Sequence, residues 1–370
     1  MRLNVAIIGA GGVGSETVQQ ICKNDLPENG QRNPTDIVAV ADSKRYLLDS
    51  RGIDPEILRV ASHTKETMKL FLEIKGEPYA ELGEILHQVG KVGLDGEVVF
   101  VDATSAGKEA MEFHKTVLAD SDNKLVAANK NPLSRFGMAD FIELTRYQAR
   151  HDYNTTVMAG GGAIDFAIRR FGIGDKITEI EGMLSGTMGY IFSELEKGAQ
   201  KFSDVVKDAS AKGYTEPNPY DDLNGVDIAR KLVILCRCSG YDVDFKDVQI
   251  EPLLDDRFAK LTGKEFWMEL AKEDERFAAM LEQAKVKNQA LRYTAKMELV
   301  DGVPVLSVAP RAYESDSPFS NLRKTQNLAR FQTKIIPEHF IQSSGAGLDV
   351  TAASIRAGIK TMLPSKLPRH

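Results

Sequence analysis

The sequence is poor in cysteine, and none of its apolar runs is long. It has three cysteines, Cys22, Cys236 and Cys238, which are too few and too badly spaced for a disulfide framework or a four-ligand zinc site. No segment approaches the ~18 to 20 consecutive apolar residues of a membrane helix. The short apolar stretch at residues 3–8 lacks the cleavage pattern of a signal peptide. These absences predict a cytoplasmic protein without a membrane partner.

Positive charge is not in excess either. Lys and Arg number 47 against 53 Asp and Glu, which gives a net charge of −6. Since nucleic-acid backbones are bound by clustered Lys and Arg, this balance argues against a nucleic-acid partner. What is present is ordinary for a globular protein, with 42% hydrophobic and 27% charged residues over a length of 370. That length predicts two domains, and the composition is typical of an enzyme.

The first motif is a glycine-rich turn that follows a short apolar strand and precedes a segment with helical spacing. It reads Gly-x-Gly-x-x-Gly, with Gly9, Gly11 and Gly14. In dinucleotide-binding turns the first glycine permits a tight turn, the second lets the backbone approach the pyrophosphate, and the third lets the helix pack on the strand. We therefore predict that this turn and the helix N-terminus, with Gly12 and Val13, bind a dinucleotide.

Asp42 ends the next apolar strand, where an acidic side chain accepts hydrogen bonds from an adenosine ribose. That position favours NAD. The residues that follow, Ser43, Lys44 and Arg45, suit the 2′-phosphate of NADP instead. The sequence leaves NAD, NADP or both open.

Two further apolar strands, residues 96–102 and 124–128, each end in a polar turn. Thr104 and Ser105 follow the first strand, and Lys130 follows the second. In an open parallel sheet such residues face the ligand crevice, which would place them near a nicotinamide and a substrate. The alternative is that the hydroxyls cap the next helix and that the lysine lies on the surface.

Acidic residues gather around one lysine in the middle of the chain. Asp227 and Lys231 are four residues apart in a predicted helix and so project from one face. Glu216, Asp221 and Asp222 lie in the preceding loop. A buried lysine among carboxylates is a candidate acid–base group, and the carboxylates suit a substrate ammonium. The alternative is a surface ion pair beside a solvated acidic loop.

Taken together, these motifs resemble homoserine dehydrogenase, most closely the short, fungal-type enzymes. The resemblance implies reversible, NAD(P)-dependent interconversion of L-aspartate 4-semialdehyde and L-homoserine, a step of threonine and methionine biosynthesis. The block that ends at Lys231 is its most specific part. The matching motifs are Gly9-x-Gly11-x-x-Gly14, Asp102-x-Thr104-Ser105, Asn129-Lys130, Ser185-Gly186-Thr187-x-x-Tyr190, the block from Gly213 to Lys231, and Ser344-Gly345-Ala-Gly347.

The resemblance also assigns roles to individual residues. It implies that Lys231 donates the proton to the alkoxide, that Asp227 hydrogen-bonds the substrate oxygen, and that Glu216 and Asp222 hold its amino group. It places Lys130 between the nicotinamide and the substrate. The remaining residues expected to touch substrate or cofactor are Gly186, Thr187, Thr104, Gly345 and Gly347.

One loop departs from the family pattern. In the family a glutamate, a glycine-rich loop and a proline bind a monovalent cation, and here Thr156 and Ile164 stand at the glutamate and proline positions. A threonine lacks the charge that holds sodium well. The expectation is a weak sodium site at most, or a substrate that is a related amino-acid alcohol or aldehyde. The candidate cation ligands are Thr156, Ala159, Gly161 and Ala163.

The predicted fold class is α/β. A Rossmann-type nucleotide-binding domain is expected at residues 1–135 plus 341–370, and an α+β substrate-binding and dimerisation domain with a mixed sheet at 136–340. Gly345 and Gly347 are expected to start a C-terminal helix whose N–H groups meet the cofactor. The resemblance implies a homodimer. Since the chain begins at the nucleotide-binding strand, we expect no fused kinase; since few residues follow Thr351, we expect no threonine-binding regulatory domain and weak or no inhibition by threonine.

Two other classes of protein are less consistent with the sequence. Aspartate-semialdehyde dehydrogenase needs a cysteine nucleophile, and no cysteine here stands in a turn between a strand and a helix. A non-catalytic nucleotide-binding regulator would not need the acid–base residues Lys130, Glu216, Asp227 and Lys231.

Overall fold

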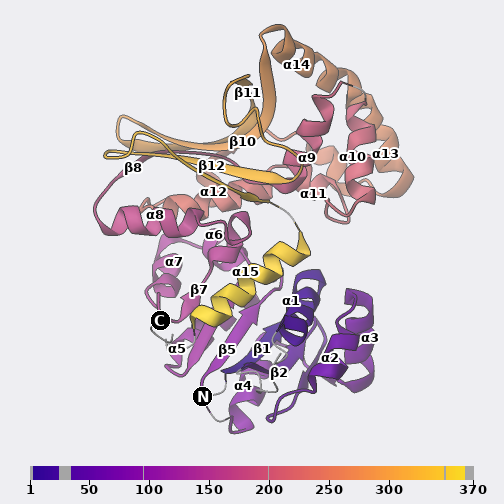
Figure 1. Cartoon of the computed structure of the whole chain (residues 1–370), viewed down its shortest axis with the longest axis vertical. Coiled ribbons are helices and arrows are strands. Elements are labelled where there is room, and N and C mark those ends of the chain that lie inside the picture. The colour runs from indigo at the N-terminus through magenta and orange to yellow at the C-terminus, as the bar shows by residue number, and fades with distance from the viewer. Residues whose placement is uncertain (1–2, 25–34, 95, 199, 346, 363–370) are drawn as a thin grey trace. The chain divides into compact units, whose positions relative to one another are not determined.

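The computed structural model describes residues 3–24, 35–94, 96–198, 200–345 and 347–362, and its elements are labelled in Figure 1. The chain divides into two compact units, the first formed by Met1–Thr156 with Leu348–His370 and the second by Val157–Gly347. Both boundaries fall later than the predicted 135/136 and 340/341. The reason is that strand β7 (His151–Asp152) still pairs in the first sheet and strand β13 (His339–Ser344) pairs in the second.

The first unit is built on a seven-stranded sheet with the order β4-β3-β2-β1-β5-β6-β7. Five of its strands are parallel, and β3 and β4 extend the β2 edge in the antiparallel sense. Besides β7, the strands are β1 Leu3–Ile8, β2 Thr35–Ala41, β3 Arg45–Leu48, β4 Glu77–Pro78, β5 Val98–Asp102 and β6 Asn123–Ala127.

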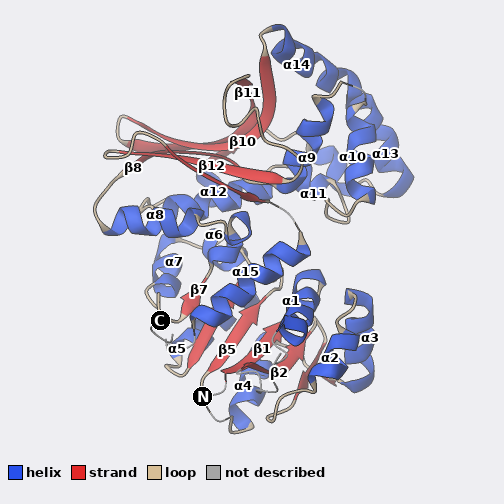
Figure 2. Ribbon diagram, in the orientation of Figure 1, coloured by secondary structure: helices blue, strands red, loops and turns tan. Residues whose placement is uncertain are grey.

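Helices pack on this sheet, as Figure 2 shows. Every residue of β1 and β5 is buried, which explains why these strands are apolar on both faces. Ile355 and Ile359 of the C-terminal helix join the core cluster that contains Val18 of the first helix. The helices of this unit are α1 Gly12–Asn24, α2 Pro55–Ala61, α3 Lys65–Lys75, α4 Leu82–Lys91, α5 Lys108–Ala119, α6 Asn131–Ser134, α7 Met138–Thr145 and α15 Leu348–Thr361.

The prediction that Gly345 starts the C-terminal helix is wrong. Gly345 follows β13 in the second unit, and its N–H donates to the Thr325 carbonyl at 2.8 Å. An added Cβ at Gly345 would lie 2.2 Å from Asn327 Oδ1, so the chain passes closely over that side chain. Strand pairing through Ser344 keeps this segment extended, and the helix begins only at Leu348, after Gly347.

The second unit is a six-stranded sheet covered by helices, with the strand order β13-β12-β8-β10-β11-β9. The sheet is mixed because β9 runs parallel to β11 while the other neighbours are antiparallel. Its strands, besides β13, are β8 Ile177–Met183, β9 Val248–Ile250, β10 Gln289–Val300, β11 Val303–Glu314 and β12 Gln326–Thr333. Its helices are α8 Ala163–Gly172, α9 Gly186–Leu195, α10 Phe202–Ala211, α11 Tyr220–Leu223, α12 Val226–Cys238, α13 Gly263–Leu270 and α14 Asp274–Val286.

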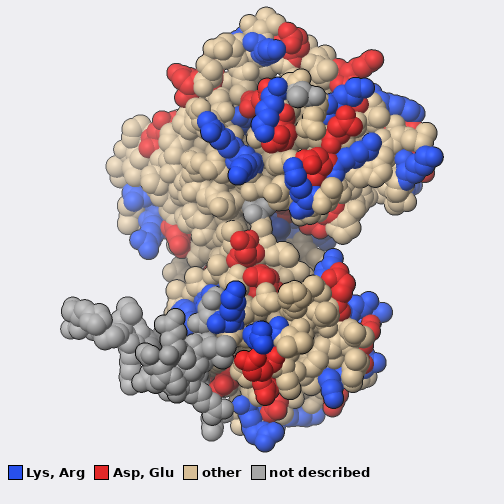
Figure 3. All heavy atoms as spheres, turned by 45° about the vertical axis from the view of Figure 1, so that its right-hand side comes forward, with Lys and Arg blue, Asp and Glu red and all other residues tan. Residues whose placement is uncertain are grey.

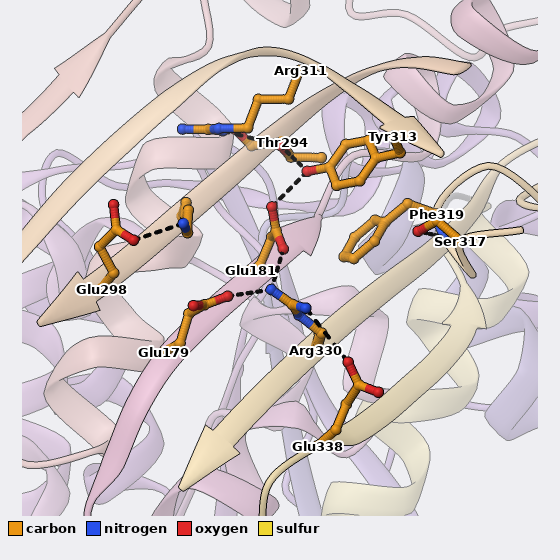
Figure 4. Close-up of polar contacts among 11 residues, drawn as sticks. Glu179, Glu181, Thr294, Glu298, Arg311, Tyr313, Ser317, Phe319, Arg330 and Glu338 are labelled. Atoms are coloured by element: carbon orange, nitrogen blue, oxygen red, sulfur yellow. Dashed lines mark hydrogen bonds and ion pairs between the residues drawn. The ribbon is translucent and has the colours of Figure 1, made fainter. Parts of the chain in front are cut away.

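The two faces of this second sheet differ in chemistry. Ile180 and its cross-strand neighbours Met297 and Phe331 are fully buried on one face. The register places Glu179 and Glu181 on the opposite face, where Arg330 donates to both carboxylates (Figure 4). This alternation of apolar and charged residues is typical of a sheet with one face against its own core.

On the face drawn in Figure 3, Lys and Arg are interspersed with Asp and Glu. Among the described residues, no helix is both long enough and apolar enough to cross a membrane.

A buried arginine on β10, Arg292, joins the segment after α9 to the loop between β11 and β12. All five N–H groups of Arg292 have acceptors: both carboxylate oxygens of Glu196 and the carbonyls of Leu291, Phe319 and Ser320. Its side chain is 1% exposed. A buried guanidinium is tolerated only when its donors are satisfied in this way.

Replacing Arg292 by alanine is expected to lower the free energy of unfolding by about 3–5 kcal/mol, because it empties the space of a large buried side chain and removes a donor from three carbonyls and from the partly exposed Glu196 carboxylate. Chemical denaturation monitored by circular dichroism measures the loss. Lys296→Ala on the same strand is the matched control. Its partly exposed pair with Glu298, at 2.7 Å, contributes below about 1 kcal/mol. Equal effects of the two substitutions would contradict the assignment.

Candidate active site

The glycine-rich turn joins β1 to α1 in the first unit. Gly9 has a φ of +99°, which favours glycine, and a Cβ there would overlap the backbone of the loop after β5. At Gly14 a Cβ would lie 2.1 Å from the Gly9 carbonyl oxygen, whereas at Gly11 no atom lies within 4 Å. Close packing therefore requires glycine at positions 9 and 14, whereas Gly11 faces open space that a ligand can occupy.

Two helices begin beside this turn. α1 starts at Gly12 and Val13, and a Cβ on Gly12 would lie 3.1 Å from the side chain of Leu348, the first residue of α15. The first N–H groups of a helix have no partner within the helix, and its N-terminus carries a partial positive charge. The turn therefore offers the donors and the potential that a pyrophosphate needs.

A cleft of about 1070 Å³ opens beside the turn and lies wholly within the first unit. Its walls come from the glycine turn, the β2–β3 turn, α3 and the loop after β5. Its size fits an extended ligand such as a dinucleotide. The polar residues and glycines among its lining are Gly9, Gly11, Asp42, Ser43, Lys44, Arg45, Lys65, Glu66, Lys69, Glu73, Tyr79, Thr104, Ser105 and Glu109.

Asp42 shapes the β2–β3 turn at one wall of this cleft. Its Oδ1 accepts the backbone N–H groups of Lys44 and Arg45 at 2.7 and 2.8 Å, and its carbonyl accepts the hydroxyl of Tyr79. The Arg45 guanidinium donates to the Gly76 carbonyl at 2.9 Å. Burial raises the pKa of Tyr79 to about 12, and the Asp42 carboxylate adds to the effect, so its hydroxyl stays protonated and remains a donor.

The loop after β5 forms another wall, and asparagine side chains hold it in place. Asn129 donates to Thr104 Oγ1 at 3.2 Å and to the Ala106 carbonyl at 2.9 Å. Asn131 donates to the Ser105 carbonyl at 2.9 Å. Lys130 lies between these two asparagines and directly precedes the short helix α6. The hydroxyl residues and the lysine singled out in the sequence thus share one corner of the first unit.

In the second unit, α12 carries Asp227 and Lys231 on one face. Lys231 Nζ lies 2.8 Å from Asp227 Oδ2 and donates to the Leu184 carbonyl at 2.6 Å. The lysine side chain is 12% exposed and that of Asp227 36%, so the lysine is largely buried while the carboxylate keeps some contact with solvent. Gly225, with a φ of +78°, precedes the helix, and a Cβ there would lie 2.3 Å from Tyr293 Oη. The helix start is therefore fixed against β10.

Asp222 is a half-buried carboxylate of the same unit. Its Oδ1 lies 3.0 Å from the Thr187 hydroxyl, and its Oδ2 accepts the Glu216 N–H at 2.7 Å. Burial raises the pKa of Asp222 to about 7, and the carboxylates of Glu216 and Asp227 add to the effect, while these two hydrogen bonds oppose it. Asp222 therefore changes charge near neutral pH.

The turn between β8 and α9 contacts both Lys231 and Asp222. Gly186 begins α9 after Ser185, whose side chain accepts the Met188 N–H at 3.3 Å. The Leu184 carbonyl before it accepts the Lys231 ammonium, and Thr187 after it contacts Asp222. A small-residue turn thus joins the lysine and the carboxylate through one backbone segment.

The expected cation loop has an unusual backbone. Met158 and Ala159 have φ of +54° and +48°, and Gly160 and Gly162 have φ of +79° and +91°. The Thr156 hydroxyl, in the first unit, donates to the Tyr153 carbonyl at 2.6 Å. Among the described residues no three His, Cys, Asp or Glu side chains are grouped to hold a metal ion. A weak cation site at Thr156, Ala159, Gly161 and Ala163 stays a prediction.

Comparison with known proteins identifies the family. A sequence model described as Homoserine dehydrogenase matches residues 164–359, more than half of the chain. The homoserine dehydrogenase of Saccharomyces cerevisiae is 32% identical over 364 residues, which cover 95% of this chain and 96% of the yeast protein. The chain belongs to the homoserine dehydrogenase family.

Larger relatives contain the same region. The chloroplastic bifunctional aspartokinase/homoserine dehydrogenase 2 of Zea mays is 31% identical over 362 residues, and the match covers 95% of this chain and 38% of the maize protein. The chain thus spans well under half of such bifunctional relatives. Its similarity to the short fungal enzymes covers nearly the whole of both proteins.

Solved structures share the fold. A crystal structure of a Candida auris protein of unknown function has a TM-score of 0.80 and 29% identity, and the match covers 98% of both chains. A hyperthermophilic archaeal homoserine dehydrogenase in complex with NADPH has a TM-score of 0.69 and 21% identity over 98% of both chains. The predicted fold class, a Rossmann-type unit plus a unit with a mixed sheet, is confirmed.

Several side chains that line the cleft or hold its loops were not among the predicted site residues. Tyr79, Lys65 and Lys69 reach the cleft from segments well beyond the glycine motif, and nothing in the local pattern marks them. A signal was present for Asn129 and Asn131, since two asparagines just after a strand commonly tie a turn through their amides.

Proposed function

We propose that the protein is an NAD(P)-dependent homoserine dehydrogenase that interconverts L-aspartate 4-semialdehyde and L-homoserine in threonine and methionine biosynthesis. The observation that carries the proposal is the largely buried Lys231, held by Asp227 and the Leu184 carbonyl beside the half-buried carboxylate of Asp222. A cation in such a position suits proton transfer, and the carboxylates suit an amino-acid ammonium. Family membership supports the same activity.

In the proposed reaction a bound NAD(P)H supplies the hydride that reaches the aldehyde carbon. Lys231 gives the Nζ proton to the oxygen that becomes the homoserine hydroxyl, while Asp227 holds the lysine ammonium in place and can accept a hydrogen bond from that hydroxyl once it has formed. Glu216 and Asp222 hold the substrate amino group, with Thr187 orienting Asp222. In the oxidative direction the neutral amine of Lys231 accepts the hydroxyl proton while the hydride leaves for the bound nucleotide, so the same residue serves both directions.

The first unit provides the proposed cofactor site. The pyrophosphate would lie on the turn with Gly9, Gly11 and Gly14, and the adenosine ribose near Asp42 and Arg45. The nicotinamide end would be lined by Thr104, Ser105 and Lys130, with Gly347 as a further contact implied by the family. NADPH is bound by the archaeal structural neighbour, and we propose that the present chain takes NADP or NAD.

Turnover of L-homoserine with NAD⁺ and with NADP⁺, followed by nucleotide absorbance, tests the proposal. Measurable reduction of either nucleotide is expected. Absence of turnover in a protein that binds the nucleotide would overturn it.

The departure at Thr156 favours a second candidate, oxidation of a related amino-acid alcohol. Assays with homologues of homoserine that are one carbon longer or shorter separate the two, because the better substrate has the higher kcat/KM.

The amino-group role of Asp222 predicts a pH dependence. An ionised Asp222 attracts the substrate ammonium and a protonated one does not, so the KM for homoserine is expected to fall as the pH rises through about 7. Asp222→Asn should flatten that profile and raise KM. The neighbouring exposed Asp221→Asn is the matched control and should keep the profile of the wild type. A wild-type KM independent of pH between 6 and 8, on the order of one unit to either side of that pKa, would contradict the role.

The same group makes stability depend on pH. Since the folded-state pKa lies above that of an unfolded aspartate, the folded protein binds this proton more tightly than the unfolded chain does. The contribution of Asp222 to the free energy of unfolding is therefore full at low pH and is lost as the pH rises through about 7. Urea unfolding of wild type and Asp222→Asn at pH 5 and pH 8 should show a smaller change for the variant.

We also propose a homodimer through the second-unit sheet, as the family resemblance implies. The face with Glu179 and Arg330 also carries Val300, Val303 and Val305, which are 50%, 62% and 37% exposed. Exposed valines beside a charged network suit a second copy of the same face. Light scattering should give twice the chain mass of 40.8 kDa for the wild type, and a monomer for Val303→Lys. A wild-type monomer at micromolar concentration would contradict the proposal.

The proposed location is the cytoplasm. All three cysteines are free and buried, as suits a reducing compartment.

A further inference from the structure

A buried histidine and aspartate of the first unit have no part in the proposed chemistry. Asp102 ends β5 and His114 lies on α5, and the side chains of both are fully buried. His114 Nε2 lies 2.8 Å from Asp102 Oδ2, and since a carboxylate can only accept, the ring nitrogen donates. A buried carboxylate is costly unless hydrogen bonds satisfy it, and His114 donates one of the hydrogen bonds that the buried Asp102 carboxylate requires.

Asp102 connects this pair to the cofactor cleft. Its other oxygen, Oδ1, accepts the N–H of Thr104 at 2.9 Å, and its carbonyl accepts the N–H of Ala128 at 2.9 Å. The carboxylate thus joins α5, through His114, to the first turn of the loop after β5. The backbone of that loop at Ala103 and Thr104 lines the cleft.

The same loop sets the position of the glycine turn. A Cβ on Gly9 would lie 2.6–2.7 Å from the peptide that joins Ala103 to Thr104, so the two loops touch through their backbones. A change in the orientation of this peptide therefore alters two walls of the cleft at once. The Thr104 hydroxyl accepts from Asn129, so a displaced Thr104 would also lose that contact.

We infer that His114 is a positioning residue for the cofactor: by donating to Asp102 it fixes the carboxylate that holds the Thr104 amide, and so it sets the shape of the cleft where the nicotinamide nucleotide binds. The inference rests on the proposed function only in taking the cleft as the nucleotide site. The hydrogen bond to Asp102 is what sets His114 apart, because His114 Nδ1 and His151 Nε2 are both buried with no partner among the described residues.

His151 provides a matched comparison in the same core. It is 3% exposed, its ring lies 5.8 Å from that of His114, and its Nδ1 donates to the Leu144 carbonyl at 3.0 Å. Burial lowers the pKa of His151 to about 3, and the neighbouring His114 adds to the effect, so it is neutral. The hydrogen bonds and ring contacts of its side chain lead to Leu144, His114 and Tyr153 and not to the cleft loop.

The test compares His114→Phe, His114→Gln and His151→Phe in the full chain. Dissociation constants for NADPH and NADH are measured by nucleotide fluorescence without amino-acid substrate, and hydrogen exchange is followed in peptides that span Thr104. His114→Phe should raise the constant for the better-bound nucleotide about tenfold or more and speed exchange at Thr104. His114→Gln, which keeps an N–H donor, should stay within about threefold of the wild type. His151→Phe should lower the melting temperature to a similar degree but leave the constant within about twofold.

Equal losses of affinity in the two phenylalanine variants would overturn the inference, as would unchanged Thr104 exchange in His114→Phe. If His114→Phe does not fold, the hydrogen bond is tested in the wild type by observing the NMR signal of the His114 Nε2 proton. That proton should resonate downfield and exchange slowly, and the signal should shift in Asp102→Asn; its absence would refute the hydrogen bond. A protein that binds nucleotide yet leaves homoserine unchanged would refute the proposed function and leave this result standing.

Discussion

Replacement of Lys231 by alanine is expected to lower kcat for homoserine oxidation about 10³-fold or more, the range that a positioned proton-transfer group contributes. Nζ lies 2.8 Å from Asp227 and 2.6 Å from the Leu184 carbonyl, in a largely buried position. The alanine side chain has no group that can accept the hydroxyl proton of homoserine. The KM should change far less than kcat, because the proposed ligands of the substrate amino group, Glu216 and Asp222, are untouched.

The variant should fold, because the partner left behind is not deeply buried. Asp227 keeps 36% of its side-chain surface exposed, so its carboxylate remains solvated when the lysine is removed. Lys197→Ala is the control: it also breaks a short-range helical ion pair of the second unit, with Glu194 at 2.7 Å, but its side chain is 63% exposed. The control should retain wild-type kcat. A Lys231→Ala enzyme within about tenfold of wild type would exclude Lys231 as the proton donor.

The nucleotide half of the fold could be predicted because its signals are local. The apolar run before Gly9 makes β1 a strand buried on both faces, and the spacing after Gly14 makes α1 a helix. The close approach of Gly14 to the Gly9 carbonyl explains why this motif constrains three-dimensional structure so strongly. Asp227 and Lys231 were predictable for the same reason, since four residues along a helix fix a common face.

Features that depend on distant partners were not predictable from the pattern. The sequence suggested Arg45 as a ligand of the 2′-phosphate of NADP, but the local pattern did not show that this residue begins β3, which pairs with β2, or that its guanidinium donates to the Gly76 carbonyl, 31 residues away. Gly345 was expected to start a helix, but pairing between β12 and β13 keeps its segment extended. The raised pKa of Asp222 depends on burial that only the assembled unit creates.

The glycine turn allows loss of cofactor binding to be separated from loss of stability. Gly11→Ala is expected to raise the dissociation constant for the preferred nucleotide about 100-fold, because the added methyl occupies space beside the backbone where the pyrophosphate is proposed to bind. The free energy of unfolding should change by no more than about 0.5 kcal/mol, since no atom of the described chain lies within 4 Å of the new Cβ. Nucleotide fluorescence titration and urea unfolding measure the two quantities on the same sample.

Gly14→Ala is the matched substitution, at the third residue of α1. Unlike Gly11→Ala, it is expected to lower the free energy of unfolding. Within a helix, alanine in place of glycine normally stabilises by about 0.5–1 kcal/mol. Here the Cβ would lie 2.1 Å from the Gly9 carbonyl oxygen, so the backbone must shift and the protein should lose about 1–3 kcal/mol instead. Nucleotide affinity should fall as well, because the shift moves Gly9. Unaltered affinity in Gly11→Ala would show that the pyrophosphate does not bind at this turn, whereas a stable Gly14→Ala would show that α1 does not pack against β1 as closely as the structure requires.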